Sequence, residues 1–496
     1  MKRGIGWMTL DLCYLPASEA LRRFRDRTLS PVEIVEAQLQ RIEETSGTIN
    51  ATSFVYAEEA LDAARDAERR YAMTDGRLRP LEGIATAIKD ESNIAGKITT
   101  YGSLIYKDNV AQTTSTVVQR LLDAGAVVHS RTTTPEFSCE GVTHSRLWGV
   151  TRNPWNLDYT PGGSSGGSGA ALAAGLTTIA NGSDIGGSIR IPASACGVVG
   201  FKPPYGRNPS SAPFNLDQYN HPGPMTRSVE DCLLMQNVMC GPDPLDIASL
   251  RPKLTMVADR SGIKGWKIAY SLDLGYFELD DEVRRNTLAA LDVFRSLGAT
   301  VEEVDLGWTK ESERAAIGHL RTIFGSWLAE YLDGTRGELL TGYARHFAEG
   351  ARESTCQDFL KSMFTAGGMY ASLGPLLESH NVFICPTLAV PAVAADHDPS
   401  KDRVTINGKD VHPSVGWPMT YPFNMLSRCP VLSVPSGRAS TGVPTGIQIV
   451  GPTYCDEAVF TAGLAYEEAI GGWYTGVHDR PAAASKQPLP SETVPA

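Results

Sequence analysis

PGGSSGGSGAALAAGLTTIANGSDIGGSIRIPA, residues 161–193, is the stretch around which the rest of the chain is organised. It contains two glycine clusters that carry serine, one over 162–167 and the other over 183–188. Glycine permits a positive φ and lets backbone N–H groups approach a ligand, so two such loops around a helix of small residues predict a site built from main chain. The hydroxyl groups beside those donors suit the attack of an alcohol on a carbonyl. The base for that attack must come from another part of the chain.

The composition of the 496 residues is that of an ordinary globular protein, with 42% hydrophobic and 20% charged residues. The formal net charge of −11 argues against a nucleic-acid partner, which would usually require a basic face. Length alone permits two or three average domains or one large α/β enzyme. We expect a small, uncharged or apolar substrate.

Nine cysteines are scattered along the chain without CxxC spacing, and their number is odd. This pattern indicates reduced thiols in a cytoplasmic protein rather than a disulfide framework or a zinc site, and we expect no metal. Asp11 interrupts the apolar residues near the N-terminus before the core of a signal peptide forms. Since no run of 18 apolar residues follows, we also expect no membrane span.

Strands alternate with helices in the first half of the chain. Ser30-Pro31-Val32-Glu33 is typical of a capping box with proline at the first helical position. Residues 84–88 form an apolar run that predicts a buried strand ending at Lys89, and a helix over 116–123 precedes a second strand over 126–130. The alternation predicts an α/β fold with a large mixed, mostly parallel sheet covered by helices on both faces.

No long linker separates the sheet segments, so we expect a single domain over residues 1–496. In the second half, strands over 266–271 and 300–304 flank an amphipathic helix over 280–297. The expected parts, in order, are N-terminal helices over 1–75, a catalytic core over 83–205, a helical layer near the substrate entrance over 305–380, a return to the sheet over 381–475 and a C-terminal tail over 480–496.

With Lys89 set beside the two serine clusters, the chain resembles the amidase signature family of serine hydrolases. The restrictive positions of the family's long signature are met from Gly162 to Ala193, and Lys89 stands 75 positions before Ser164, a spacing that is also typical. A pattern of this length is far more specific than a lone GxGxxG. The resemblance extends through residues 30–33, 135–137 and 446–451, so it covers nearly the whole chain.

The resemblance implies a nucleophile at Ser188, a bridging serine after a cis peptide bond at Ser164 and a terminal base at Lys89. A lysine is a base only when neutral, and the apolar run before Lys89 suits the desolvation that lowers its pKa. The resemblance further implies an oxyanion hole made by the backbone N–H groups of Ile185, Gly186, Gly187 and Ser188. It gives orienting roles to Ser165, Ser183, Asp184 and Arg190, and it suggests a substrate pocket at Phe137 and Cys139, for which ordinary core packing is the alternative. Trp148, near the site, is either a core aromatic or part of that pocket.

Two other interpretations of the glycine clusters explain less of the chain. Residues 163–167 also fit GxSxG, the nucleophile elbow of α/β-hydrolases, which would make Ser165 the nucleophile. That interpretation accounts for neither the second cluster nor Lys89, and only His412 and His478 lie late enough to complete its triad. A phosphate-binding loop is disfavoured because no Gly-Lys-Ser/Thr follows the glycines.

The function implied by the resemblance is hydrolysis of a small carboxylic amide, aliphatic or aryl, to an acid plus an amine or ammonia, without a cofactor. An ester or carbamate hydrolase, an amidotransferase subunit that releases ammonia from glutamine for a partner, and a non-catalytic binding protein are the alternatives. The tyrosine-rich segment typical of that subunit is absent around residues 364–379, which favours a stand-alone amidase. Acyl and amine specificity stay open, as does assembly into a homodimer.

Overall fold

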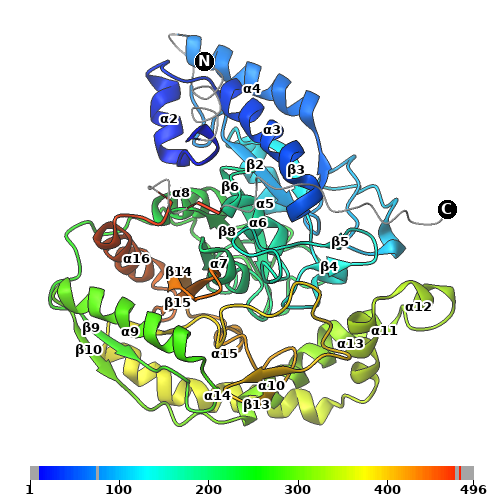
Figure 1. Ribbon diagram of the computed structural model, residues 1–496, viewed down its shortest axis with the longest axis vertical. Coiled ribbons are helices and arrows are strands. Elements are labelled where there is room, and N and C mark those ends of the chain that lie inside the picture. The colour runs from blue at the N-terminus through cyan, green and yellow to red at the C-terminus, as the bar shows by residue number, and fades with distance from the viewer. Residues whose placement is uncertain (1–10, 74–76, 475–479, 482–496) are drawn as a thin grey trace.

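A sheet of 11 strands runs through the computed structural model, which describes residues 11–73, 77–474 and 480–481 (Figure 1). Its strand order is β1-β3-β2-β6-β8-β7-β14-β15-β11-β9-β10. The strands are β1 (Thr52–Val55), β2 (Ala85–Lys89), β3 (Val127–Thr132), β6 (Ile179–Asp184), β7 (Val199–Lys202), β8 (His221–Thr226), β9 (Lys267–Tyr270), β10 (Thr300–Glu303), β11 (Val382–Pro386), β14 (Val431–Arg438) and β15 (Pro444–Val450).

Pairing in this sheet is antiparallel in the middle, parallel on either side of that middle, and antiparallel again at the β1 edge. The strands β3, β2 and β6 pair in parallel, as do β11, β9 and β10. The remaining six neighbouring pairs are antiparallel. The α/β class and the large mixed sheet are confirmed, whereas the expected predominance of parallel pairs is wrong. Short connections such as residues 439–443, between β14 and β15, need no helical crossover and therefore give antiparallel neighbours.

The N-terminal region consists of three helices and one edge strand. The helices are α2 (Ala17–Arg25), α3 (Pro31–Ile49) and α4 (Ala57–Ala72). The predicted capping box is confirmed, since Ser30 accepts from Val32 and the Glu33 side chain accepts from the Ser30 backbone. Strand β1 was not predicted because its four partly exposed residues show no hydrophobic alternation. Residues 1–10 and 74–75 of the predicted helical region lie outside the described residues.

Helices cover both faces of the sheet, as predicted. Gly446 and Gln448 of β15 face α7, where they approach Ser194 and Arg190. Thr445 points the other way and bonds Asn286 of α9, because successive strand residues alternate between faces. The first face carries α6 (Gly166–Ala173) and α7 (Arg190–Cys196), which contact each other, and the second carries α8 (Val229–Met239), α9 (Asp281–Ser296) and α16 (Asp456–Ile470).

Residues 305–380, predicted as a helical layer near the substrate entrance, are mostly helical and lie along one end of the molecule (Figure 1). This region comprises α10 (Glu311–Leu320), a π-helical turn η3 (Arg321–Gly325), α11 (Ser326–Ala329), α12 (Thr335–Leu339), α13 (Gly342–Arg352) and α14 (Cys356–Ser379). The smaller elements are η1 (Leu104–Tyr106), α5 (Thr116–Asp123), η2 (Glu136–Ser138), β4 (His144–Ser145), β5 (Gly149–Val150), β12 (Val404–Ile406), β13 (Lys409–Val411) and α15 (Pro422–Met425).

The chain returns to the sheet through β11, β14 and β15, as predicted for 381–475, although residue 475 itself is not described. Of the predicted tail over 480–496, only residues 480 and 481 are described, and Arg480 pairs with Asp11 at 2.7 Å. Division of the chain into one domain stays a prediction. All nine cysteines are free thiols. No helix within the described ranges is long and apolar enough to cross a membrane.

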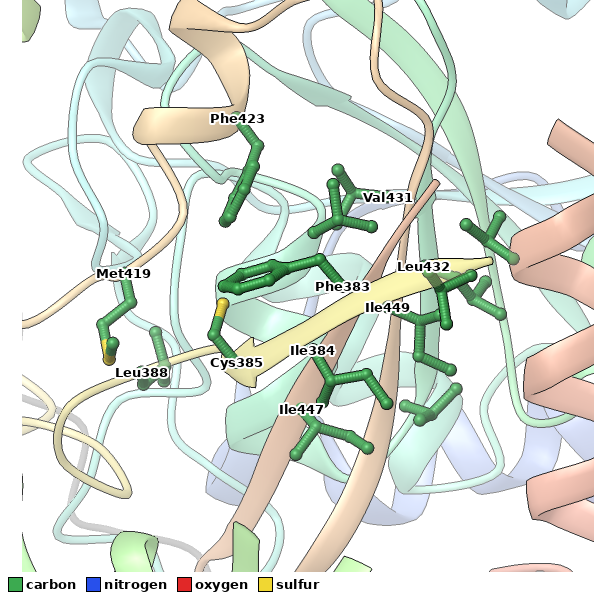
Figure 2. Packing of buried hydrophobic residues seen from close by; sticks show 14 of the residues in the cluster. Phe383, Ile384, Cys385, Leu388, Met419, Phe423, Val431, Leu432, Ile447 and Ile449 are labelled. Atoms are coloured by element: carbon green, nitrogen blue, oxygen red, sulfur yellow. The ribbon is translucent and has the colours of Figure 1, made fainter. Parts of the chain in front are cut away.

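The largest hydrophobic core packs against both faces of β11, β14 and β15. Figure 2 shows Phe383 beside Phe423 and Val431 on one side of β11, and Ile384 beside Ile447 on the other. The rings of Phe383 and Phe423 are 6.3 Å apart, and both side chains are fully buried. Truncation of Phe383 would therefore open a cavity at the centre of this core.

We expect Phe383→Ala to lower the free energy of unfolding by about 3–5 kcal/mol, the usual cost of removing a buried ring. Phe364→Ala is the matched control, because Phe364 lies on α14 with 70% of its surface exposed. Its effect should stay within about 0.5 kcal/mol. Urea denaturation followed by circular dichroism measures both variants, and equal losses would contradict this description of the core.

Candidate active site

Lys89 lies at the carboxyl end of β2, fully buried, where β2 runs parallel to β6. Its Nζ is 2.7 Å from Ser164 Oγ and 2.9 Å from Ser183 Oγ. Because parallel strands end at the same edge of a sheet, the end of β6 brings Ser183 next to the lysine. Three residues that are distant in sequence thus meet around one amine.

The first serine loop is held tightly against its surroundings. The peptide bond between Gly163 and Ser164 is cis, as the resemblance implied. A Cβ on Gly163 would overlap the backbone of Val142, so a side chain has no room there. Ser165 donates its N–H to Ser188 O at 3.1 Å, and its Oγ accepts from the N–H of Ser183 at 3.3 Å. Ser165 therefore joins the two serine loops to each other.

The second serine loop is fastened by the buried ion pair of Asp184 and Arg190. Arg190 Nε and Nη2 each lie 2.9 Å from one oxygen of the Asp184 carboxylate. Burial alone would raise the pKa of Asp184, but the charge and hydrogen bonds of Arg190 hold it well below its ordinary value. The carboxylate also accepts the N–H groups of Gly187 at 2.8 Å and Ile189 at 3.3 Å, which flank Ser188.

Three backbone N–H groups beside Ser188 are available to a bound oxyanion. Those of Ile185, Gly186 and Ser188 have no hydrogen-bond acceptor among the described residues. The N–H of Gly187, which was predicted to join them, instead donates to Asp184. The predicted set is corrected accordingly, because a donor already bonded to a carboxylate is not free for an oxyanion.

Two adjoining cavities open onto the serine loops. The first, here called the Ser188 cavity, has a volume of about 150 Å³ and is lined by Ser188 and Gly186. The second, the Ser164 cavity, has a volume of about 440 Å³ and is lined by Ser164 and Ser183. Residues that line both cavities are Ser138, Ile185 and Phe324.

Of the three predicted pocket residues, two line a cavity. Phe137 lies in the wall of the Ser164 cavity and Cys139 in the wall of the Ser188 cavity. Trp148 lines neither of these two cavities, which agrees with its alternative assignment as a core aromatic. Its indole N–H donates to Thr100 Oγ1 at 3.1 Å and its ring packs edge-on against Phe54 of β1, which holds it behind the site.

Sequence reasoning missed several residues that the structure brings to the site. Glu91 Oε2 lies 2.8 Å from Lys89 Nζ, and Thr420 Oγ1 donates to Gly186 O at 2.6 Å. Glu140, in the wall of the Ser188 cavity, has a pKa raised by burial to about 7. Glu91 had a visible signal, since it follows the apolar strand by two positions, whereas Thr420 lies in no motif.

Burial lowers the pKa of Lys89 from its ordinary value, although the charge and hydrogen bond of Glu91 and the charge of Asp184 oppose that shift. A lowered pKa raises the fraction of neutral amine, the form that accepts a proton. Across the described ranges, no group of three or more His, Cys, Asp or Glu side chains is placed to hold a metal ion.

Gly187→Ala should destabilise the protein, because Gly187 has φ +130° and a Cβ there would overlap the Thr420 side chain. Overpacking and backbone strain each cost about 1–3 kcal/mol. Gly186→Ala is the matched control, since a Cβ at Gly186 meets nothing within 4 Å. Thermal denaturation of both variants tests this difference, and equal melting temperatures would show that the loop is less tightly packed than described.

Comparison with known proteins places this site in a family. A family model described as Amidase matches residues 33–460. The chain is 34% identical over 472 residues to an acylamidase of Rhodococcus erythropolis, covering 93% of this chain and 97% of the relative. It is 32% identical over 510 residues to the A subunit of the glutamyl-tRNA(Gln) amidotransferase of Geobacter metallireducens, covering 94% and 99%.

Solved structures agree with the sequence matches. A bacterial aryl acylamidase of the amidase signature family superposes with a TM-score of 0.87 at 30% identity, covering 96% of this chain and 99% of that one. A 6-aminohexanoate cyclic dimer hydrolase superposes with a TM-score of 0.79 at 25% identity, covering 95% and 99%. The matching signature, the shared fold and the family model lead to one conclusion: the chain belongs to the Amidase family, the amidase signature hydrolases.

Proposed function

We propose that this chain is an acylamidase, which hydrolyses an N-acyl amine to a carboxylic acid and an amine through an acyl-Ser188 intermediate. The observation that carries the proposal is the fully buried Lys89, whose Nζ lies 2.7 Å from Ser164 Oγ beside the Ser188 loop. A buried amine with a lowered pKa within hydrogen-bond reach of a serine has the geometry of a general base. The similar acylamidase and aryl acylamidase support the same reaction class.

In the proposed mechanism, protons move along the two serines while the acyl group is transferred. Ser188 Oγ forms a bond to the amide carbon as its proton passes to Ser164, whose own proton passes to Lys89. The N–H groups of Ile185, Gly186 and Ser188 stabilise the oxyanion. When the C–N bond breaks, Ser164 gives a proton to the leaving amine and regains one from Lys89, and water then releases the acid from Ser188.

The two cavities divide the substrate between them. Since Ser164 protonates the leaving amine, the amine should occupy the Ser164 cavity, and the acyl group should occupy the smaller Ser188 cavity. Aromatic rings favour aromatic partners beyond the area they bury. The walls of the Ser164 cavity carry the rings of Tyr101, Tyr106, Phe137, Phe214 and Trp327. The substrate class that fits this division is an anilide with a short acyl chain.

An amidotransferase subunit is the second candidate, because the identity to the amidotransferase relative is close to that of the acylamidase. That function requires glutamine as substrate and a partner that consumes ammonia. Esters and carbamates fit the same acyl chemistry. A substrate panel therefore separates the candidates more directly than further comparison does.

We expect hydrolysis of anilides with short acyl chains and loss of turnover by about 10³-fold or more in Ser188→Ala, because the variant lacks the nucleophile. Mass spectrometry of products from anilides, primary amides, glutamine, aryl esters and carbamates makes the measurement. Ser296→Ala, at an exposed serine of α9, is the matched control. Exclusive turnover of glutamine would favour the amidotransferase function, and retained activity in Ser188→Ala would overturn the mechanism.

The pH dependence should report Lys89. Its neutral form is the base, so kcat/KM should fall tenfold per pH unit as the pH drops below the lowered pKa of Lys89. On the high-pH plateau, Lys89→Ala should reduce the rate by about 10²–10⁴-fold, the usual contribution of a general base, and the loss should shrink at low pH, where the wild-type lysine is itself protonated. A variant that keeps the wild-type acidic limb would exclude Lys89 as the titrating group.

A further inference from the structure

Glu91 has no part in the mechanism above, yet it touches the base. It follows β2 by two residues, and its Oε2 lies 2.8 Å from Lys89 Nζ. The side chain is 24% exposed and lies in the wall of the Ser164 cavity. Within the described part of the chain, no other carboxylate lies within 4 Å of that amine.

Three oxygen atoms surround the amine, and their chemistry limits how it can be oriented. A neutral amine has two N–H donors and one lone pair. The negative charge of the Glu91 carboxylate, whose Oε2 forms an ion pair with Nζ, repels the lone pair and so favours an N–H on its side. Ser183 Oγ, at 2.9 Å, can accept the second. The lone pair then faces Ser164 Oγ at 2.7 Å, which is the direction needed to receive a proton.

We propose that Glu91 is a positioning residue, which directs the lone pair of Lys89 toward Ser164 and supplies the counter-charge when that amine becomes an ammonium. The inference rests on the proposed function and adds a residue to it. No group is consumed in this role: the proton moves from Ser164 Oγ to Lys89 Nζ, and later returns by the same path, while the carboxylate stays ionised throughout.

The other charged groups near Lys89 do not replace this carboxylate. Asp184, from β6, is already paired with Arg190 at 2.9 Å. Asp90, the residue next to Lys89, is buried and lies 3.6 Å from Arg131. Tyr101 lines the same cavity as Glu91, and burial together with the charge of Glu91 raises its pKa, so it stays neutral. Glu91 is thus the carboxylate whose charge acts on Lys89 most directly.

The negative charge of Glu91 and the burial of Lys89 shift the pKa of that lysine in opposite directions. Burial lowers the pKa of Lys89, whereas Glu91 raises it. Burial alone would raise the pKa of Glu91, but the charge of Lys89 and hydrogen bonds from Lys89, Ser138 and Ser183 outweigh this, so the carboxylate stays ionised. Removal of the charge should therefore lower the pKa of Lys89 further. The acidic limb of the base-dependent step should move to lower pH, by about 1–3 units for an opposite charge at this distance.

The test is the pH dependence of covalent inactivation by an active-site-directed aryl phosphonate, a probe that reacts with Ser188 whatever the natural substrate is. We expect Glu91→Gln to shift the acidic limb of the inactivation rate downward by at least about one pH unit. Glu91→Ala removes the same charge and leaves a smaller side chain, so it should shift the acidic limb in the same direction. This variant replaces Glu91→Gln in the test if the glutamine variant does not fold. Glu59→Gln is the matched control, since it removes the carboxylate of another glutamate–lysine pair, with Lys97.

The outcomes separate this inference from the proposed function. Labelling of the wild type but not of Ser188→Ala would support the proposed nucleophile. If both Glu91 variants then react more slowly at every pH while the acidic limb of their rate–pH profile stays in place, Glu91 is only structural. In that case the inference fails and the proposed function does not. An upward shift of the limb would overturn it as well. If the wild type is not labelled at Ser188, the proposed nucleophile itself fails. An unchanged acidic limb in Glu59→Gln would show that the shift comes from the charge at Glu91 and not from the loss of any glutamate–lysine pair.

Discussion

The buried ion pair of Asp184 and Arg190 is the interaction on which the site depends. Removing two charges from water costs more than their attraction returns unless every remaining donor is satisfied. Arg190 meets this condition, because its five N–H groups bond the two Asp184 oxygens, Thr420 O, Gln448 Oε1 and Asn424 Oδ1. One side chain thereby joins the end of β6, the first turn of α7, the segment before β14 and the middle of β15.

This network fastens the nucleophile loop, residues 184–188, although Gly186 and Gly187 have no side chains to anchor it. Asp184 uses its spare hydrogen-bonding capacity on the N–H groups of Gly187 and Ile189, and Thr420 holds the carbonyl of Gly186. These contacts hold the backbone that carries the free N–H groups of Ile185, Gly186 and Ser188. Donors held in place before the reaction are what stabilisation of the oxyanion requires. Gly187 is needed for space, because a Cβ there would overlap Thr420, and the ion pair supplies anchoring contacts that glycine lacks.

Much of the site could be predicted because its residues are concentrated in one continuous signature and one strand end. Ser183 and Lys89 meet because the parallel ends of β2 and β6 bring them to the same edge of the sheet, and Ser164, from the loop before α6, reaches the same amine. Gly187 was assigned to the oxyanion hole and Trp148 was left between core and pocket, because a pattern of residue types does not show which donor is already bonded or which way a ring points. The central antiparallel pairs escaped prediction for a similar reason: strand direction depends on how connections pack.

By itself, the sequence determined the α/β class, the family and the small set of residues that carry its signature, since these follow from local hydrophobic periodicity and from side chains at set spacings. Only the tertiary structure decided the partners that come from far along the chain. Thr420 on the nucleophile loop and the two cavities that divide around Ser138 and Ile185 depend on distances across the fold. Glu91 is close to Lys89 in sequence, but its contact with the amine depends on the turn that follows β2. Such contacts are set by packing between segments, which no spacing in one sequence records.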